Sequence, residues 1–511
     1  MLKHPFRSLD GVVASEHPLA SLIGSRVIER GNAVDAAVST SLTLSVTLPH
    51  LGGLGGDFFA LIKDPEGKVF FVDGAGFSPK ALSRELMLEK GFRNMPSHGP
   101  LAITVPGIVD GLRVMWERFG SLEWADLVME VERVAREGFP VSGSLASSVE
   151  LLRSSLSRDE GSAYTYLKTP ISEGSVVRFP GLSRALQLIA EDPRSFYEGD
   201  IAERISTYIR KAGGVIEPDD FRVFKASLGE PLKGSYRGRA VYEMPPPTQG
   251  VTTLHILKLL EQIDLLRFRP ESRERVETLL KAAIPSYRAR DSYVTNPDHM
   301  EVSVEELLSK EFIRRLREEF NGASPDSLGC VGGGGDTTFF AVADKEGFLV
   351  AGIQSLFYPF GSYVTEPHYG ITLNSRASSF SLDPRHVNRL EPRKRTMHTL
   401  SAVIIEDGER ELVLGLSGGH YRPLLHAQIL TNIIDYSMPV QEAIEHPRFI
   451  WEVGTRKVVM EEGLEPSIKG FNVSIRKYPS RLGVAAAVEV KAGVRSGYCD
   501  IRGDGLPVGL P

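Results

Sequence analysis

The sequence predicts an α+β fold in which helices pack on layered β-sheets. Pairs of strand-like segments joined by tight polar turns occur near the start of the chain and again in its last third. Between them lies a series of segments whose apolar residues recur at helical spacing. Strands drawn from both ends of a 511-residue chain, with helices between them, are typical of such a layered arrangement.

The first fifty residues predict two helices. Apolar residues over 17–30 fall on one helical face, and Gly31 is a suitable C-terminal stop. Asn32 can cap the helix that follows, with Asp35 in its first turn. Residues 33–48 are apolar on every side of that helix, so we expect it to be buried.

Three hairpins are predicted from apolar segments that flank turn residues. They cover 58–74, 337–356 and 401–416, and their turns contain Pro-Glu-Gly, Asp344 to Gly347, and Asp407-Gly408. Six segments in the middle of the chain predict helices: 106–119, 123–138, 181–192, 199–214, 251–264 and 304–320.

The composition excludes several classes of protein. Hydrophobic residues make up 42% and charged residues 24%, and a net charge of −6 with both signs interspersed gives no basic surface for nucleic acid or an anionic membrane. No apolar run approaches the ~18–20 residues of a membrane span, and the N-terminus lacks a signal-peptide core, so we expect a cytoplasmic protein. Two cysteines, Cys330 and Cys499, and scattered histidines predict no disulfide framework, no metal site and no cofactor.

Two glycine-rich segments do not fit nucleotide binding. A dinucleotide fingerprint runs from strand through glycines to helix. Gly332 to Gly335 follow a polar linker and precede a strand, and GGLGG at 52–56 follows a helix and precedes a strand. The order of elements is therefore wrong in both places.

A serine hydrolase is a sharper alternative. GLSGG at 415–419 fits the G-x-S-x-G pattern around Ser417 and lies between a predicted strand and a predicted helix. The acid and histidine that should follow are Asp435 and His446, which are only a helix apart, and no further βα units come after them. The same glycines can instead present a pair of backbone amides.

Thr337 opens a strand directly after a polar, glycine-rich linker at 321–335. Threonine is common in strands, so its position alone is compatible with a purely structural role. Cleavage between Asp336 and Thr337 would release an α-amine beside the hydroxyl, and such an amine has a pKa of ~7.7–8.0. It can take the hydroxyl proton near neutral pH, so one residue supplies both nucleophile and base. The glycines allow the chain to bend so that Oγ reaches the preceding carbonyl.

Segments along nearly the whole chain, in the same order, resemble the γ-glutamyltranspeptidase family. They lie at 31–62, 101–112 (LAITVPGIVDGL), 244–264 (MPPPTQGVTTLHILKLLEQID), 335–351 (GDTTFFAVADKEGFLVA), 374–381 (NSRASSFS), 416–423 (LSGGHYRP) and 435–449 (DYSMPVQEAIEHPRF). The resemblance implies a four-layer αββα sandwich of the N-terminal-nucleophile hydrolase type. It also implies self-cleavage into a large subunit, 1–336, and a small subunit, 337–511, which form one interleaved globular unit.

The same resemblance assigns catalytic roles. It implies that Thr337 is the nucleophile and that Ser355 is the second hydroxyl, usually a threonine, that orients it. It implies that the backbone amides of Gly418 and Gly419 form the oxyanion hole. One such donor is typically worth roughly 3–4 kcal/mol in the transition state.

Two charged residues of the family pattern are missing. The arginine that grips the glutamyl α-carboxylate falls at Ala75, in Ala-Gly-Phe-Ser-Pro, and the aspartate that binds the α-amine falls at Ser379. A zwitterionic head needs a paired cation and anion to leave water. The sequence therefore predicts an acyl amide other than an ordinary γ-glutamyl compound as substrate.

Four further positions differ from the family pattern. A glutamine becomes Arg376, an asparagine near the nucleophile becomes Phe357, and a Ser-Ser pair becomes His398 and Thr399. Phe357 and His398 suit a less polar acyl group. Arg376 is interpreted either as a carboxylate ligand or, with slight preference, as a solvated surface arginine.

Two functions stay open at this stage. The first is an active amide hydrolase or acyltransferase that forms an acyl-enzyme with a small-molecule acyl amide. The second is an uncleaved, inactive homologue that binds a small molecule. The acyl group, the acceptor (water or an amine) and a higher oligomer stay undecided.

Overall fold

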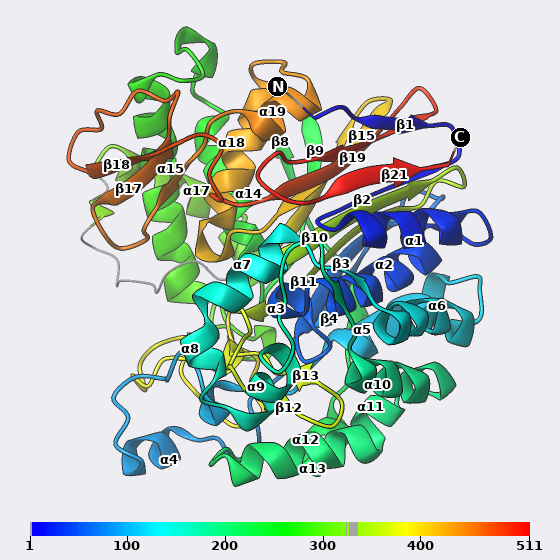
Figure 1. Cartoon of the computed structure of the whole chain (residues 1–511). Helices are drawn as coiled ribbons and strands as arrows, with labels where there is room; N and C mark the ends of the chain where they lie inside the picture. The colour runs from blue at the N-terminus through cyan, green and yellow to red at the C-terminus, as the bar shows by residue number, and fades with distance from the viewer. Residues whose placement is uncertain (1–2, 323, 326–335, 511) are drawn as a thin grey trace.

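The computed structural model describes residues 3–322, 324–325 and 336–510, so most of the predicted linker at 321–335 lies outside the described residues. Two seven-stranded sheets, antiparallel throughout, stack on each other between two layers of helices (Figure 1). This is the four-layer αββα sandwich.

The first sheet has the strand order β1-β20-β19-β15-β14-β9-β8. Its strands are β1 Phe6–Ser8, β8 Leu232–Tyr236, β9 Arg239–Glu243, β14 Ala402–Asp407, β15 Arg410–Leu416, β19 Ala485–Lys491 and β20 Val494–Cys499. The predicted hairpin at 401–416 is confirmed as β14 and β15. The end of β15 leads directly into the Ser417-Gly418-Gly419 turn.

The second sheet has the order β21-β2-β10-β11-β3-β4-β7. Its strands are β2 Gly11–Ser15, β3 Asp57–Lys63, β4 Val69–Gly74, β7 Ser227–Gly229, β10 Asp336–Asp344, β11 Leu349–Phe357 and β21 Leu506–Gly509. The other two predicted hairpins are confirmed as β3–β4 and β10–β11. Because β10 and β11 lie between β2 and β3, residues from both sides of position 337 share the centre of this sheet.

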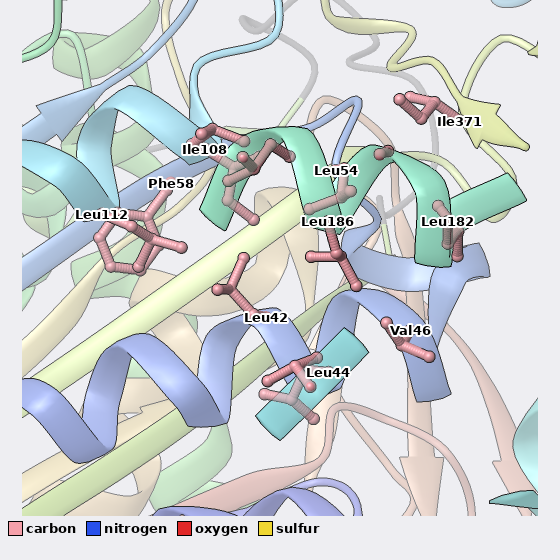
Figure 2. Packing of buried hydrophobic residues seen from close by; sticks show 14 of the residues in the cluster. Leu42, Leu44, Val46, Leu54, Phe58, Ile108, Leu112, Leu182, Leu186 and Ile371 are labelled. Atoms are coloured by element: carbon pink, nitrogen blue, oxygen red, sulfur yellow. The ribbon is translucent and has the colours of Figure 1, made fainter. Parts of the chain in front are cut away.

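Helices on the outer face of the second sheet form the largest apolar core. Figure 2 shows Leu42 and Leu44 packed close to Leu186, with Phe58 of β3 beside Leu112. The main helices of this layer are α1 Pro18–Ile28, α2 Ala33–Thr47, α5 Ile108–Phe119, α6 Trp124–Glu137 and α10 Pro180–Glu191.

The N-terminal helices follow their sequence signals. Asn32 caps α2, and its side chain accepts the amides of Val34 and Asp35 while the Asp35 carboxylate accepts the Asn32 amide. This reciprocal capping box satisfies donors that the first helical turn leaves unpaired. Every residue of α2 is buried, as its all-round apolar sequence predicts.

A second helical layer covers the outer face of the first sheet, and a third core fills the space between the sheets. The second layer contains α14 Gly250–Leu260, α15 Arg273–Tyr293, α17 Lys310–Phe320 and α18 Arg422–Ile434. The core between the sheets includes Phe59 and Phe339, and the glycine at 415 allows the Phe339 ring to approach β15 closely.

Shorter elements surround these layers. The remaining helices are α3 Pro49–Gly52, α4 Arg84–Glu89, α7 Gly143–Leu151, α8 Arg153–Leu156, α9 Glu160–Tyr166, α11 Ser195–Glu198, α12 Asp200–Lys211, α13 Pro218–Val223, α16 Val304–Leu307 and α19 Val440–Glu445. The remaining strands are β5 Phe139–Pro140, β6 Val176–Val177, β12 Thr365–Glu366, β13 Ile371–Thr372, β16 Phe449–Trp451, β17 Lys457–Glu461 and β18 Asn472–Arg476. None of the helices within the described ranges is both long enough and apolar enough to cross a bilayer.

Two parts of the helical prediction need correction. The sequence analysis did not identify α15, although it has 21 residues, because Pro285 lies inside it and its start is strongly charged. Proline normally ends or kinks a helix, which hides the spacing of the buried residues before it. The helix predicted over 304–320 is divided into α16 and α17 at Ser309, whose side chain caps the second piece.

Candidate active site

Thr337 lies near the start of β10, in the middle of the second sheet, with only 1% of its surface exposed. The ladder between β10 and β11 contains a bulge at this point, so that Ser355 and Leu356 both stand opposite the single residue Thr337. A bulge locally breaks the pairing and redirects side chains, and bulges are common beside active sites.

Ser355 is one of the two residues of this bulge. It is directly paired with Asp57 at the start of β3, so both side chains point to the same face of the sheet. The Ser355 hydroxyl accepts the backbone amide of Phe357 at 2.8 Å. Phe357 has a φ of +83°, a conformation that bulky residues rarely adopt outside functional sites.

A buried arginine, which the sequence analysis did not single out, holds the Thr337 side chain. Arg422 Nη2 donates to Thr337 Oγ1 at 3.1 Å, and Arg422 Nε donates to the Leu416 carbonyl at 2.7 Å. Arg422 Nη1 donates to the Thr399 carbonyl. Burial, and after it the charge of Arg376, lowers the Arg422 pKa to about 9, so the guanidinium stays protonated near neutral pH.

The predicted oxyanion glycines lie on the turn that precedes Arg422. Gly418 has a φ of +149° and Gly419 a φ of +50°, which fall in the region that favours glycine. Two side chains from neighbouring elements of the same helical layer, at the start of α14 and on α15, brace this turn. Gln249 Nε2 donates to the Gly419 carbonyl at 2.8 Å, and the Tyr287 hydroxyl donates to the His420 carbonyl at 2.8 Å.

Gln249 also connects this turn to the strand that follows Thr399. Its Nε2 donates to the Thr399 carbonyl at 2.7 Å, and its Oε1 accepts Arg290 Nη1 at 2.8 Å. Arg290 is fully buried on α15, the helix that the sequence analysis missed. The Thr399 and Gly419 carbonyls are thus both held by the Gln249 side chain, which Arg290 holds in turn.

The predicted acyl-recognition residues gather around a second buried arginine. Arg376 Nε donates to Asp57 Oδ2 at 3.1 Å, and His398 Nε2 shares the same oxygen at 3.1 Å. Because His398 Nδ1 accepts the Leu400 amide, its proton lies on Nε2 and points at Asp57. Asp57 was not among the predicted site residues.

The preferred interpretation of Arg376 as a solvated surface residue is wrong. Its side chain is fully buried, and the guanidinium carbon lies 4.3 Å from the centre of the Phe357 ring. Arg376 Nη1 also lies 3.4 Å from Thr399 Oγ1. The structure therefore brings Arg376, Phe357, His398 and Thr399 together, and it joins them to Thr337 through Arg422.

The two positions that lack the family's charges lie at the edge of this cluster. Ala75 is buried and precedes Gly76, whose amide donates to Asp57 Oδ1 at 2.9 Å. Ser379 lies on the same 3-10 turn as Arg376, and its hydroxyl is buried without a hydrogen-bond partner within the described residues. Neither position supplies a charge.

The charges of this cluster are shifted by burial and by each other. The pKa of Asp57 is lowered: burial acts to raise it, and the His398 hydrogen bond and the Arg376 charge outweigh that effect. Burial, together with the Arg376 charge, lowers the pKa of His398 to about 3. At neutral pH the cluster therefore contains a carboxylate, a guanidinium and a neutral imidazole.

Thr337, Arg376 and Arg422 are all buried. Two hollows of about 300 Å³ each are lined by other residues of the large N-terminal part and the 366–370 segment, and contain none of the site residues. Among the described residues there is no group of three or more histidine, cysteine, aspartate or glutamate side chains arranged to hold a metal ion.

One known protein family matches this chain along nearly its whole length. The model of the family described as gamma-glutamyltranspeptidase matches residues 20–510. The chain belongs to this family. It is 37% identical to the glutathione hydrolase-like YwrD proenzyme of Bacillus subtilis (strain 168), with 98% of each chain covered. It is 31% identical to the oxamate amidohydrolase proenzyme of Klebsiella pneumoniae, with 98% of each covered.

Solved structures support the same assignment. The crystal structure of cephalosporin acylase from Bacillus halodurans superposes with a TM-score of 0.91 at 28% identity, covering 100% of this chain and 98% of that one. As a member of the gamma-glutamyltranspeptidase family, the chain is an enzyme with an N-terminal-nucleophile hydrolase fold. The relatives include proenzymes named glutathione hydrolase-like, oxamate amidohydrolase and acylase.

The alternative of a serine hydrolase around Ser417 is wrong. The strand, turn and helix are present, but the Ser417 hydroxyl accepts the Val484 amide at 2.8 Å. His446 is hydrogen-bonded to Glu271, and Asp435 to Arg237 and Tyr236. The three residues of the proposed triad are thus engaged with other partners.

The first prediction concerns the oxyanion turn. Changing Gly419 to Val places a branched side chain at a φ of +50° beside Arg422, and we expect a loss of turnover of at least ~100-fold. The matched control is Gly408→Val, which has a φ of +64° on an exposed hairpin with nothing within 4 Å of an added Cβ. Steady-state kinetics on folded protein compare the two variants. Equal turnover of the two variants would contradict the assignment of Gly419 to the oxyanion hole.

The second prediction concerns acid stability. His398 is neutral when folded, with a pKa of about 3, and titrates near 6.5 when unfolded. Between these two values the unfolded chain binds more protons than the folded chain. The contribution of His398 to the free energy of unfolding is therefore fully present above pH 6.5, and it falls as the pH is lowered, by up to ~1.4 kcal/mol per pH unit. In His398→Gln we expect a shallower loss of melting temperature from pH 6.5 to 4 than in the exposed control His4→Gln. Identical slopes would contradict the assigned neutral state.

Proposed function

We propose that Thr337 becomes the N-terminal nucleophile of this enzyme after the chain cuts itself between Asp336 and Thr337. One observation carries the proposal: the Thr337 hydroxyl is buried at the start of a central strand and accepts a hydrogen bond from the buried Arg422 guanidinium at 3.1 Å. A fixed cation beside a hydroxyl oxygen favours the negative charge that develops on it during attack.

We propose that self-cleavage proceeds through an acyl shift from the Thr337 nitrogen to its Oγ. Thr337 Oγ attacks the Asp336 carbonyl carbon, the C–N bond breaks, and the Thr337 nitrogen takes the proton that Oγ releases. Water then hydrolyses the resulting ester, which leaves a carboxylate on Asp336 and a free amine on Thr337. The bulge formed by Ser355 and Leu356 supports this step because it frees the backbone around Thr337 from regular ladder geometry.

Turnover repeats the same chemistry on a substrate. Thr337 Oγ attacks the amide carbonyl of the substrate, its own α-amine takes the proton, and the Gly418 and Gly419 amides stabilise the oxyanion. The amine then passes the proton to the leaving nitrogen, and an acyl ester remains on Thr337. Water or a second amine releases the acyl group, so hydrolysis and transfer share one intermediate.

We propose that residues 1–336 and 337–511 stay together as interleaved subunits. The hydrogen bonds of β10 with β2 and of β11 with β3 join the two parts along the middle of a sheet. The substrate-binding groups also come from both parts, since Asp57 precedes the cut and Arg376 follows it. A cytoplasmic location stays a prediction, and the oligomeric state stays open.

We further propose that the substrate is an acyl amide without the amino-acid head of a γ-glutamyl group. Ala75 and Ser379 supply neither of the two charges that such a head needs, and Arg376 is a cation in a different place. The names of the relatives fit a family whose acyl groups vary. Oxamate, from which one relative takes its name, carries a carboxylate and no α-amine.

The third prediction is self-cleavage. Purified protein should give pieces of about 336 and about 175 residues on a denaturing gel, with threonine as the N-terminal residue of the smaller piece. Thr337→Ala should remain a single chain, and the neighbouring control Thr338→Ala should still be cut. A single intact band from wild-type protein after long incubation would favour the inactive binding protein instead.

The fourth prediction concerns the acyl group. On fully cleaved enzyme we expect kcat/KM for a glutaryl-anilide to exceed that for the γ-glutamyl-anilide, because burying an unpaired ammonium costs several kcal/mol. A loss of ~3 kcal/mol corresponds to more than a hundredfold. A strong preference for the γ-glutamyl compound would show that other residues rebuild the amine site.

A further inference from the structure

Half of the Arg376 guanidinium has no hydrogen-bond partner within the described residues. Nε donates to Asp57 and Nη1 lies at the long distance of 3.4 Å from Thr399 Oγ1. Nη2 is buried and has no hydrogen-bond partner within the described residues. An unpaired donor on a fully buried guanidinium is costly, since buried polar groups normally find acceptors.

A second unpartnered donor lies on the same turn. Ser379 is three residues after Arg376 in a 3-10 helix, where side chains at this spacing lie on one side. The Ser379 hydroxyl is also buried without a partner within the described residues. One short turn therefore presents two free donors, one of them charged.

The direct contacts around this turn contain more guanidinium groups than carboxylates, although Glu243 and Glu16 lie near enough to act on Arg422 through their charge. Asp57 is the carboxylate in contact with Arg376, but it also accepts the His398 proton and the Gly76 amide. The three nitrogens of Arg422 end on neutral oxygens, two of them carbonyls and one the Thr337 hydroxyl. Two buried guanidinium groups therefore share one direct carboxylate partner in the described part of the chain.

A chain of hydrogen bonds connects Arg376 to Thr337, the proposed nucleophile. Thr399 accepts from Arg376 through its hydroxyl and from Arg422 through its carbonyl, and Arg422 donates to Thr337. Phe357 covers one face of the Arg376 guanidinium, with 4.3 Å between ring centre and Cζ. The stacked ring holds the guanidinium flat and leaves its edge for a planar, bidentate acceptor.

We propose that Arg376, assisted by Ser379, binds a carboxylate at the far end of the acyl group, so that the substrates are monoamides of short dicarboxylic acids. This inference rests on the proposed function of Thr337. A carboxylate matches the guanidinium edge in shape, supplies acceptors to both free donors, and gives the two guanidinium groups a second direct carboxylate partner. The acyl chain between the carboxylate and the amide carbonyl spans the distance from Arg376 to Thr337.

The test uses fully cleaved enzyme and a series of anilides with oxalyl, malonyl, succinyl, glutaryl and adipyl groups. Each is compared with its neutral counterpart, in which a primary amide replaces the terminal carboxylate. We expect one chain length to be best and its carboxylate to raise kcat/KM by at least about tenfold, as for one charged hydrogen bond. No advantage of the carboxylate at any length would overturn the proposal.

Variants assign the effect to the turn. In Arg376→Met combined with Asp57→Asn, which removes both charges of the buried pair, the carboxylate advantage should disappear. Ser379→Ala should reduce it severalfold. The control Arg385→Met removes a surface arginine, 88% exposed, from the following loop and should keep it. An advantage that survives in the double variant would assign the carboxylate to another residue.

If the double variant does not fold, binding of the free dicarboxylic acids to wild-type enzyme tests the same site. Calorimetry on cleaved wild-type enzyme should detect succinate or glutarate and give at least tenfold weaker binding of the matching diamide. Equal affinities would contradict the carboxylate site. The N-terminal threonine and a trapped acyl-enzyme are measured by mass spectrometry in the same samples. Their absence would contradict the nucleophile, whereas their presence without carboxylate preference contradicts only this inference.

Discussion

The guanidinium of Arg422 joins the two sheets at the point where Thr337 begins its strand. Two of its nitrogens bind carbonyls that belong to the first sheet or lead into it, those of Leu416 and Thr399, and the third binds the Thr337 hydroxyl of the second sheet. A buried cation is costly unless its donors are satisfied. The position of Thr337, the proposed nucleophile, therefore depends on how the two sheets stack.

A second set of contacts fixes the same region from outside the sheets. Gln249 precedes α14, and Tyr287 and Arg290 lie on α15. The hydrogen bonds of Gln249 and Tyr287 end on the turn that leads into α18, and Arg290 donates to Gln249 Oε1. Both helices come before position 337 and the turn comes after it. The proposed cut thus separates the proposed oxyanion glycines from the side chains that brace them, and the packing of the sandwich keeps them together.

Local signals explain why much of the fold could be predicted from the sequence. The Asn32 and Asp35 capping box and the hairpin turn at Asp407-Gly408 depend on residues close together in the chain. The role of Asp57 depends on contacts with Arg376 and His398, more than 300 residues away, and nothing local in the sequence marks it. The same holds for Arg290, because Pro285 hides the helix that carries it.

Arg376 is a residue whose burial could not be predicted from the sequence. An arginine that replaces a glutamine is most easily interpreted as a surface residue when its partner is unknown, since unpaired arginines are rarely buried. The partner here, Asp57, is itself held by the Gly76 amide, and an added Cβ at Gly76 would lie 1.6 Å from the Val105 carbonyl oxygen. The segment that follows Ala75 is therefore packed too closely to shift, and the Asp57 carboxylate stays where it meets the new guanidinium. Under the proposed binding mode, the absence of a cation at position 75 and the presence of one at 376 change where a substrate carboxylate binds, while Arg422 still donates to the Thr337 hydroxyl.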